Sequence, residues 1–385
     1  MLSGVAFASW VVRIPDVQSR LGLSESGLGL VLLGVAVGGL LALPLSGVLI
    51  GRFGSRSVAR AAGLCLAASV AVPAQVATPW LLTLILVVLG GATSIFSVAL
   101  NTQAAALERR MKRPIMAGLH ALYSVGGLVG AAVGGIIAGA GISANAHLGT
   151  AAVVVAVVSL TTSRALLRPE IDGAIGGRAF ARPSRPLLLL GLVAFCVLFG
   201  EGAVADWSAV YLRDVGRAGP ALAAAGYAAF SLMMAAGRFV GDALTVRLGP
   251  AWLVRLGGSS AAVGIALAVG QGNPWITVLG FGAVGAGLST IFPTMLAAAG
   301  RVPGTAPSTA IAAISSVGYV GFLAGPPLIG LVAEATSLRV GVGLVGLTSL
   351  LIIALSGILP ATSTFGARRP TPSLARLDAA RLSDA

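Results

Sequence analysis

Two acidic residues, Glu201 and Asp206, stand out inside or at the edge of an apolar run, Leu187–Asp214. The pattern predicts one helix that enters the membrane at Pro186, and Glu201 then lies about 22 Å along it, at ~1.5 Å per residue. That position is inside a hydrocarbon core roughly 30 Å thick. A charged group there costs on the order of 2.5 kcal/mol or more, so Glu201 is a candidate for a substrate or proton path. A carboxyl group in such a setting can take up a proton near neutral pH.

Both carboxylates also have a structural interpretation. Glu201 stands between Gly200 and Gly202, where a neighbouring helix can approach closely, and it could bond to a backbone or pair with an arginine. Asp206 is expected about 30 Å along the helix, where it is either a gate or a solvated carboxylate at the outer interface.

The composition indicates an integral membrane protein. Of 385 residues, 57 % are hydrophobic and 10 % charged, and the mean hydropathy is +0.97, whereas soluble domains have about 25 % charged residues. The net charge of +13 comes from short basic clusters between apolar runs, so we expect a lipid bilayer as the partner and no nucleic acid. Cys65 and Cys196 lie inside apolar runs and predict neither a disulfide nor a metal site.

Hydropathy predicts an all-α protein with twelve transmembrane helices. The spans fall near 1–13, 27–50, 58–78, 80–104, 115–140, 147–167, 187–212, 219–244, 251–271, 274–299, 307–333 and 338–360. The first is short because Arg13 interrupts it, and no basic region marks it as a signal peptide. We therefore expect that this helix is truncated and that the natural chain begins upstream of Met1.

The basic residues predict an orientation. One set of loops and the tail carry 19 of them, against five on the other side, so the positive-inside rule places both termini in the cytoplasm. Arginine in place of lysine, with heavy use of alanine and glycine, indicates a GC-rich bacterial genome and therefore an inner membrane. Residues 168–186 form a Gly/Pro/Arg-rich cytoplasmic linker, and the polar tail, 361–385, is predicted to be disordered.

The linker separates two similar halves, predicted to be six-helix bundles over 1–167 and 187–360. Ala8-Ser9-Trp10 matches Ala205-Asp206-Trp207, and three other short matches have nearly the same offset. Parallel six-helix repeats with the substrate between them are a known transporter plan.

The segment Gly47–Arg56 resembles the signature between the second and third spans of the major facilitator superfamily, although Gly51 replaces its aspartate. The Gly325–Gly330 break in span 11 is also similar to that family. The segments Ser9–Asp16 and Glu201–Trp207 resemble more narrowly its YbjJ-like bacterial inner-membrane members. The resemblance implies rocker-type alternating access, with spans 1 and 7 lining the cavity as symmetry mates.

On that basis Trp10 and Arg13, which share a helix face, join the candidate site. We hypothesise that Arg13 pairs with Glu201 or Asp206 in one access state. The alternative is an interfacial Trp and Arg that anchor the helix.

Other polar residues in the spans are candidates to line a substrate path, and hydrogen bonding between helices is the alternative for each. They are Asn101, Gln103, His120, Tyr123, Ser124, Tyr227, Ser231, Ser315, Ser316 and Tyr319. Pro293, Pro326 and Pro327 are predicted hinges. By resemblance, Arg238, Asp242 and Arg247 form a cytoplasmic gating cluster with Arg52, which could instead be a flanking charge.

The sequence therefore predicts a monomeric secondary active transporter for a small solute, coupled to protons. A polar or sugar-like solute is favoured over an amphipathic drug. Drug or metabolite efflux on the same fold, and a non-transporting membrane sensor or assembly partner, are the alternatives. The sequence has no Walker A, H-E-x-x-H or G-x-S-x-G motif and no Cys/His cluster, so we expect neither an enzyme nor a cofactor.

Overall fold

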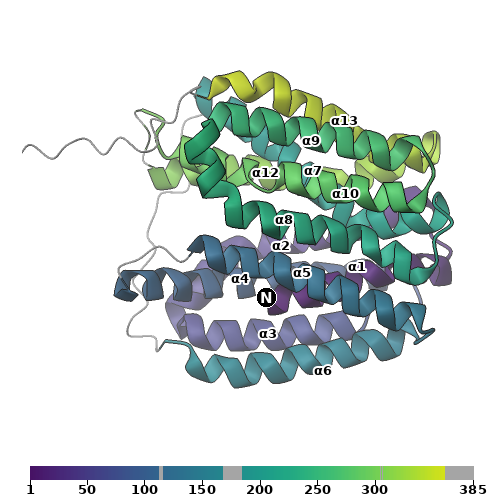
Figure 1. Ribbon diagram of the computed structural model, residues 1–385. Helices are drawn as coiled ribbons and strands as arrows, with labels where there is room; N and C mark the ends of the chain where they lie inside the picture. Colours follow the sequence, from purple (N-terminus) through teal and green to yellow (C-terminus); the bar gives the residue numbers. More distant parts are fainter. Residues whose placement is uncertain (112–115, 168–183, 304, 306, 360–385) are drawn as a thin grey trace, which may run out of the picture.

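The computed structural model describes residues 1–111, 116–167, 184–303, 305 and 307–359, and Figure 1 shows them as a bundle of long helices. The helices are α1 (Leu2–Leu21), α2 (Glu25–Phe53), α3 (Ser55–Ala71), α4 (Pro79–Met111), α5 (Met116–Gly139), α6 (Ala144–Thr162), α7 (Arg185–Asp214), α8 (Pro220–Leu248), α9 (Pro250–Gly270), α10 (Pro274–Leu288), α11 (Ile291–Ala299), α12 (Pro307–Ala335) and α13 (Leu338–Leu355). Two short 3-10 turns, Ser163–Ala165 and Ser356–Ile358, follow α6 and α13.

The prediction of an all-helical membrane protein is confirmed. Each of the twelve predicted spans coincides with a helix or, for 274–299, with the pair α10 and α11. Within the described residues, ten spans are long and apolar enough to cross a membrane. The other two helices are α3, with 17 residues, and α1, which carries charges in its second half.

The first helix differs from its prediction. It does not end at Arg13 but continues through Pro15 to Leu21, where Gly22 closes it in the left-handed conformation, with φ 60°. The helix tolerates Arg13 because other polar groups neutralise that side chain, as described below. The predicted tail and nearly all of the linker lie outside the described residues.

The predicted proline hinges have two different structures. The tenth span is interrupted at Ser289 and Thr290, between α10 and α11, because Pro293 has no N–H to donate to the Ser289 carbonyl. In contrast, α12 continues through Pro326 and Pro327. The carbonyl of Pro326 is instead a packing surface, only 2.5 Å from where a Cβ on Gly29 would lie.

The chain forms two halves, which lie in the lower and upper parts of Figure 1: α1–α6 (the N half) and α7–α13 (the C half). The halves meet where α5 packs on α8, α2 on α12 and α1 on α7. We call the end where α6 ends and α7 begins the linker end, and the end where α1, α5, α7 and α12 end the latch end. Among the candidate spans α7 is the most buried, with 72 % of its most apolar window inside the structure.

Glycines bring the helices of each half into close contact. A Cβ on Gly38 of α2 would collide with the carbonyl of Val87 in α4, and one on Gly90 would collide with the carbonyl of Val35. Small residues at such crossings let backbones approach, which is a principal source of helix association in lipid.

We predict that Gly38→Ala destabilises the protein by about 1–3 kcal/mol, because the backbone of Val87 cannot move away from the new methyl group. The matched control is Gly47→Ala in the same helix, where the added Cβ has no atom within 4 Å, and its effect should stay within about 0.5 kcal/mol. Thermal unfolding in detergent measures both. Equal effects of the two substitutions would contradict the close contact at Gly38.

Candidate functional site

The centre of the candidate site is an ion pair between α7 and α8. Glu201 lies near the middle of α7, about 24 Å from Arg185 and about 20 Å from Asp214 at ~1.5 Å per residue. Its Oε1 is 3.5 Å from Nη2 of Arg238 in α8. Nη1 of the same guanidinium donates a hydrogen bond of 2.8 Å to Oγ of Ser124 in α5. Arg238 therefore links Glu201 of the C half to the hydroxyl group of Ser124 in the N half.

Tyrosines from both halves surround this pair. Tyr123 of α5 interacts electrostatically with Glu201, Arg238 and Tyr319 of α12. Tyr227 of α8 interacts with Tyr123 and Glu201, and its hydroxyl shares a hydrogen bond with Ser231. Three of the four tyrosines in the chain therefore lie around one half-buried carboxylate–arginine pair.

Asp206 lies one to two turns beyond Glu201 on α7 and is only 8 % exposed. The prediction of a solvated interfacial carboxylate is therefore wrong, because α7 continues to Asp214 and other helices cover this position. Asp206 interacts electrostatically with Tyr227. Among the described residues it forms none of the ion pairs within 4 Å, so the site holds one unpaired buried carboxylate beside one paired carboxylate.

Trp10 and Trp207 are the symmetry-related tryptophans of α1 and α7. Both side chains are fully buried, so Trp10 is not the interfacial anchor of the alternative interpretation. Their indole N–H groups find no acceptor among the described residues. Buried donors without an acceptor are rare in folded proteins, so these two positions distinguish α1 and α7 from the other described helices of the bundle only by their unmet hydrogen bonds.

A second charged cluster joins the two halves at the latch end. Asp16 of α1 accepts hydrogen bonds from Nη1 of Arg13, at 2.9 Å, and from Nη1 of Arg213 in α7, at 2.7 Å. Nη2 of Arg213 also donates to the carbonyl of Pro15 and to the hydroxyl of Ser19. This cluster of Arg13, Asp16 and Arg213, here called the latch cluster, ties the end of α1 to the end of α7.

Arg13 is 3 % exposed, and two more of its N–H groups donate hydrogen bonds within the N half. Nε donates to Nδ1 of His147 in α6 at 2.9 Å, and Nη2 donates to the carbonyl of Ile142 at 2.8 Å. In this structure Arg13 is thus bound to Asp16 and not to Glu201 or Asp206, because Asp16 is one turn away on the same helix.

The latch end has a further contact between the halves, where α2 begins and α12 ends. The backbone N–H of Ser26 donates to the carboxylate of Glu334 at 3.0 Å. One turn further along α2, Gly29 packs on the carbonyl of Pro326, and Gly330 packs on the carbonyl of Glu25.

The other predicted residues lie away from the central pair or have local partners. The side-chain amide of Gln103 donates to Ser55 and to the carbonyl of Leu167, and its oxygen accepts from the Leu167 N–H, so it fastens α4 to the end of the N half. Ser316 is exposed and donates to Ala312 in its own helix. Asn101, Arg52 and Arg247 are also exposed, and the side chains of His120 and Asp242 lie outside the described part of the chain.

The predicted gating cluster needs a correction. Arg238 does not join Arg247 at the linker end but reaches Glu201, because it lies ten residues, about 15 Å, before the end of α8. Sequence reasoning also missed Asp16, His147 and Glu334 as functional candidates. The i, i+3 spacing of Arg13 and Asp16 was an available signal, whereas nothing in the sequence pairs either residue with α6 or α7.

Metal chemistry finds no support in the part of the chain that the structure describes. No group of three or more His, Cys, Asp or Glu side chains is placed to hold a metal ion there.

Comparisons with known proteins agree with this architecture. The model of the Major Facilitator Superfamily matches residues 1–306. An MFS-type transporter of Yersinia pestis is 35 % identical over 92 % of each chain. The membrane protein MosC of Rhizobium meliloti is 30 % identical over 94 % of this chain and 87 % of its own.

Two solved structures share the fold. The nucleoside transporter NupG superposes with a TM-score of 0.69 at 15 % identity, over 93 % of this chain and 97 % of its own. A bacterial homologue of the human lysosomal transporter Spinster superposes with a TM-score of 0.71 at 16 % identity, over 93 % of each chain. At these identities the likeness concerns the fold alone.

We predict that Asp16→Asn lowers the free energy of unfolding by about 1–3 kcal/mol, because the buried guanidinium of Arg13 loses its charged acceptor. The matched control is Asp214→Asn, an exposed carboxylate at the same end of the molecule with none of the ion pairs within 4 Å that the described residues form. Thermal unfolding in detergent compares the two variants. Equal unfolding temperatures would show that the latch cluster does not stabilise the fold.

Proposed function

Because the chain belongs to the major facilitator superfamily, whose members are membrane transport proteins and not enzymes, we propose that it moves a small polar solute by alternating access, coupled to protons through Glu201. The observation that carries this proposal is the Glu201–Arg238–Ser124 connection between the halves. A change in the charge of Glu201 therefore affects both the proposed binding site and the contact between the halves.

The proposed coupling follows from electrostatics. With Glu201 ionised, the guanidinium of Arg238 is held between a carboxylate and a hydroxyl group. A proton on Glu201 removes the negative charge, so the attraction that holds Arg238 in place falls steeply in a setting of low dielectric constant. Arg238 can then donate a hydrogen bond to an acceptor on the solute. The bound solute then decides whether Arg238 keeps or loses its hydrogen bond to Ser124.

The surroundings of the pair favour a polar solute. Tyr123, Tyr227, Tyr319 and Ser231 offer hydroxyl groups that both donate and accept hydrogen bonds, and the tyrosine rings provide flat apolar surface. Such a mixture fits a small metabolite or sugar-like molecule better than a large amphipathic drug. NupG is named as a nucleoside transporter, but a likeness at 15 % identity carries the fold and not the solute.

The latch end supports the alternating-access part of the proposal. The latch cluster and the contact between Ser26 and Glu334 both cross from the N half to the C half. With both termini placed in the cytoplasm by the positive-inside rule, this structure is held together on the outer side of the bacterial inner membrane. Opening to that side requires the Asp16–Arg213 pair to separate.

The finer organisation belongs to the same proposal. It comprises two six-helix bundles over 1–167 and 187–360, a cytoplasmic linker over 168–186, a cytoplasmic tail over 361–385 and a monomeric state. The narrower likeness to YbjJ-like members rests on the segments Ser9–Asp16 and Glu201–Trp207.

We predict that Glu201→Gln abolishes solute-driven proton movement in proteoliposomes while the protein still binds the solute. The amide cannot release or take up a proton, yet it keeps the shape and the hydrogen-bonding capacity of the side chain. Pooled small solutes are applied to wild type and variant, and proton flux is read with a pH-sensitive dye inside the vesicles.

The control for this test is Glu108→Gln, which makes the same chemical change on a half-buried side chain near the linker end of α4. Proton flux in that control should resemble the wild type. If labelled solute equilibrates without proton movement in the wild type, proton coupling is wrong; if no solute crosses, the transport proposal is wrong.

We also predict that joining α2 to α12 at the latch end stops transport. Cysteines replace Ser26 and Glu334, whose polar atoms are 3.0 Å apart, in a chain in which Cys65 is changed to Ser. A short thiol-reactive linker should then block solute uptake, and a cleavable linker should restore it on reduction. The single-cysteine variants are the controls, and unchanged uptake after complete cross-linking would refute alternating access.

A further inference from the structure

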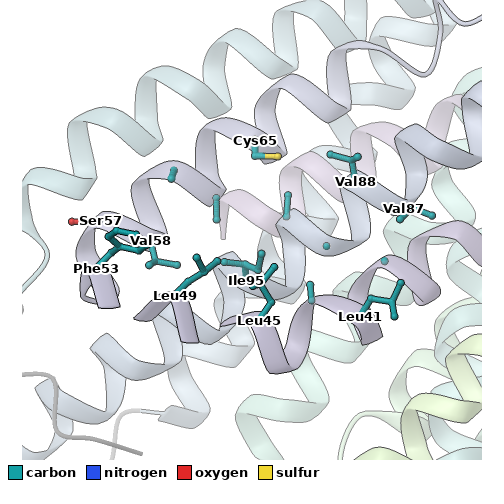
Figure 2. Close-up of a pocket in the computed structure, with 16 residues that line it drawn as sticks. Leu41, Leu45, Leu49, Phe53, Ser57, Val58, Cys65, Val87, Val88 and Ile95 are labelled. Atoms are coloured by element: carbon teal, nitrogen blue, oxygen red, sulfur yellow. The ribbon is translucent and has the colours of Figure 1, made fainter. Parts of the chain in front are cut away.

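A long apolar groove lies on the N half, away from the central pair. It has a volume of about 660 Å³ and is formed by α2, α3 and α4. Figure 2 shows its lining, which includes Leu41, Leu45 and Phe53 of α2, Ser57 and Cys65 of α3, and Val88 of α4. A cavity of this size is in the range of sites that hold a whole small ligand.

The packing of the helices explains the groove. At Gly38 and Gly90 the backbones of α2 and α4 touch, and the lining side chains Leu49, Phe53 and Ile95 lie further toward the linker end. Helix α3 packs mainly on α4 and α6 and makes little contact with α2. An open channel is left between α2 and α3, with α4 as its floor.

The apolar walls of the groove are exposed. Leu41 is 66 % exposed and Phe53 is 52 % exposed, in helices that the fold places in a membrane. From Leu41 to Phe53 the groove extends about 18 Å, at ~1.5 Å per residue. That length is close to half of a hydrocarbon core roughly 30 Å thick, which is the depth that one acyl chain occupies.

The linker end of the groove is basic. The guanidinium carbon of Arg52 lies 5.3 Å from the ring centre of Phe53, which lines the groove. Arg56 and Arg60 follow on α3, and the hydroxyl-bearing Ser57 is part of the lining itself. Arg52 is exposed and has no hydrogen bond or ion pair among the described residues, so its charge is available to a ligand.

The C half has a comparable arginine that already donates a hydrogen bond within its own half. The guanidinium of Arg255 lies 5.1 Å from the ring centre of Trp252, but its Nε donates to Ser356 at 3.1 Å. The two halves thus share an arginine stacked on an aromatic ring at the linker end, and only the one in the N half borders the groove.

From these observations we propose that the groove between α2, α3 and α4 is a binding site for one anionic phospholipid. One acyl chain fills the channel from Phe53 to Leu41, and the phosphate group lies at the linker end beside Arg52 and Arg56. The apolar walls select a lipid chain, and the basic end selects a negatively charged headgroup, since each arginine near an anionic lipid surface contributes on the order of 1 kcal/mol. This site is independent of the solute site and of proton coupling.

The thiol of Cys65 provides a direct test. Cys65 is exposed and lines the groove, whereas Cys196 is buried and serves as an internal reference. The quantity to measure is the rate at which a small maleimide alkylates Cys65 in detergent-purified protein as phosphatidylglycerol or phosphatidylcholine is added. Phosphatidylglycerol is expected to slow the reaction severalfold at concentrations at which phosphatidylcholine has little effect.

Two variants separate the headgroup from the chain. Arg52→Gln should reduce the preference for phosphatidylglycerol about fivefold, the value of one basic residue, while the matched Arg255→Gln should leave it unchanged. Ala61→Trp, at an exposed position of the lining, should fill the channel, and native mass spectrometry should then show one bound phosphatidylglycerol fewer than in the wild type.

Several results would overturn the proposal. Equal protection of Cys65 by both lipids would show that the groove does not select the anionic headgroup. Equal effects of Arg52→Gln and Arg255→Gln would show that Arg52 does not contribute to that selection. Protection that depends on protein concentration and not on lipid would identify a second copy of the chain as the occupant. An unchanged lipid count in Ala61→Trp, with the variant folded by its thermal transition, would mean that the groove does not hold the chain.

Discussion

The structure depends on the cost of holding a carboxylate in the middle of a membrane protein. Glu201 lies half-buried near the centre of α7, and the desolvation of a carboxylate at such a depth costs several kcal/mol. Arg238 offsets that cost, but at 3.5 Å the pair is longer than a close ion pair. The guanidinium also holds Ser124 at 2.8 Å. The charge of Glu201 is thereby compensated by a residue that also holds the opposite half.

Two kinds of contact hold the helices of this fold together. Within each half, glycines such as Gly38 and Gly90 put backbones in contact, and these crossings cannot separate without opening the core. Between the halves, several of the contacts are polar and lie near the ends of helices, as at Asp16 with Arg213 and Ser26 with Glu334. Polar contacts at helix ends can exchange a protein partner for water at little net cost. The proposed alternating access would separate the halves at these polar contacts and at the α2–α12 crossing, where Gly29 and Gly330 pack on the opposite helix.

The two halves also differ on the surface where the groove of the N half lies. The two halves carry an arginine stacked on an aromatic ring at corresponding ends, yet Arg255 is held by Ser356 whereas Arg52 has no such partner among the residues that the structure describes. The difference arises from packing, because α3 has few contacts with α2 and leaves the groove beside Phe53 open. Lipid and solute would thus bind to different faces of the same bundle.

The sequence by itself determined the class of protein, the positions of the helices and the presence of a carboxylate at membrane depth. These properties depend on local hydropathy and on the requirement that every backbone group in lipid be hydrogen-bonded within its own helix. It also singled out Glu201, Arg238, Tyr123, Tyr227 and Tyr319, although not as neighbours. Only the tertiary structure decided the partners: Arg238 with Glu201, Arg213 with Asp16, and Asp206 buried without an ion pair to any described residue. The physical reason is that pairing depends on the rotation and crossing of helices distant in sequence, which close packing of small residues sets and which the hydropathy of a single helix does not encode.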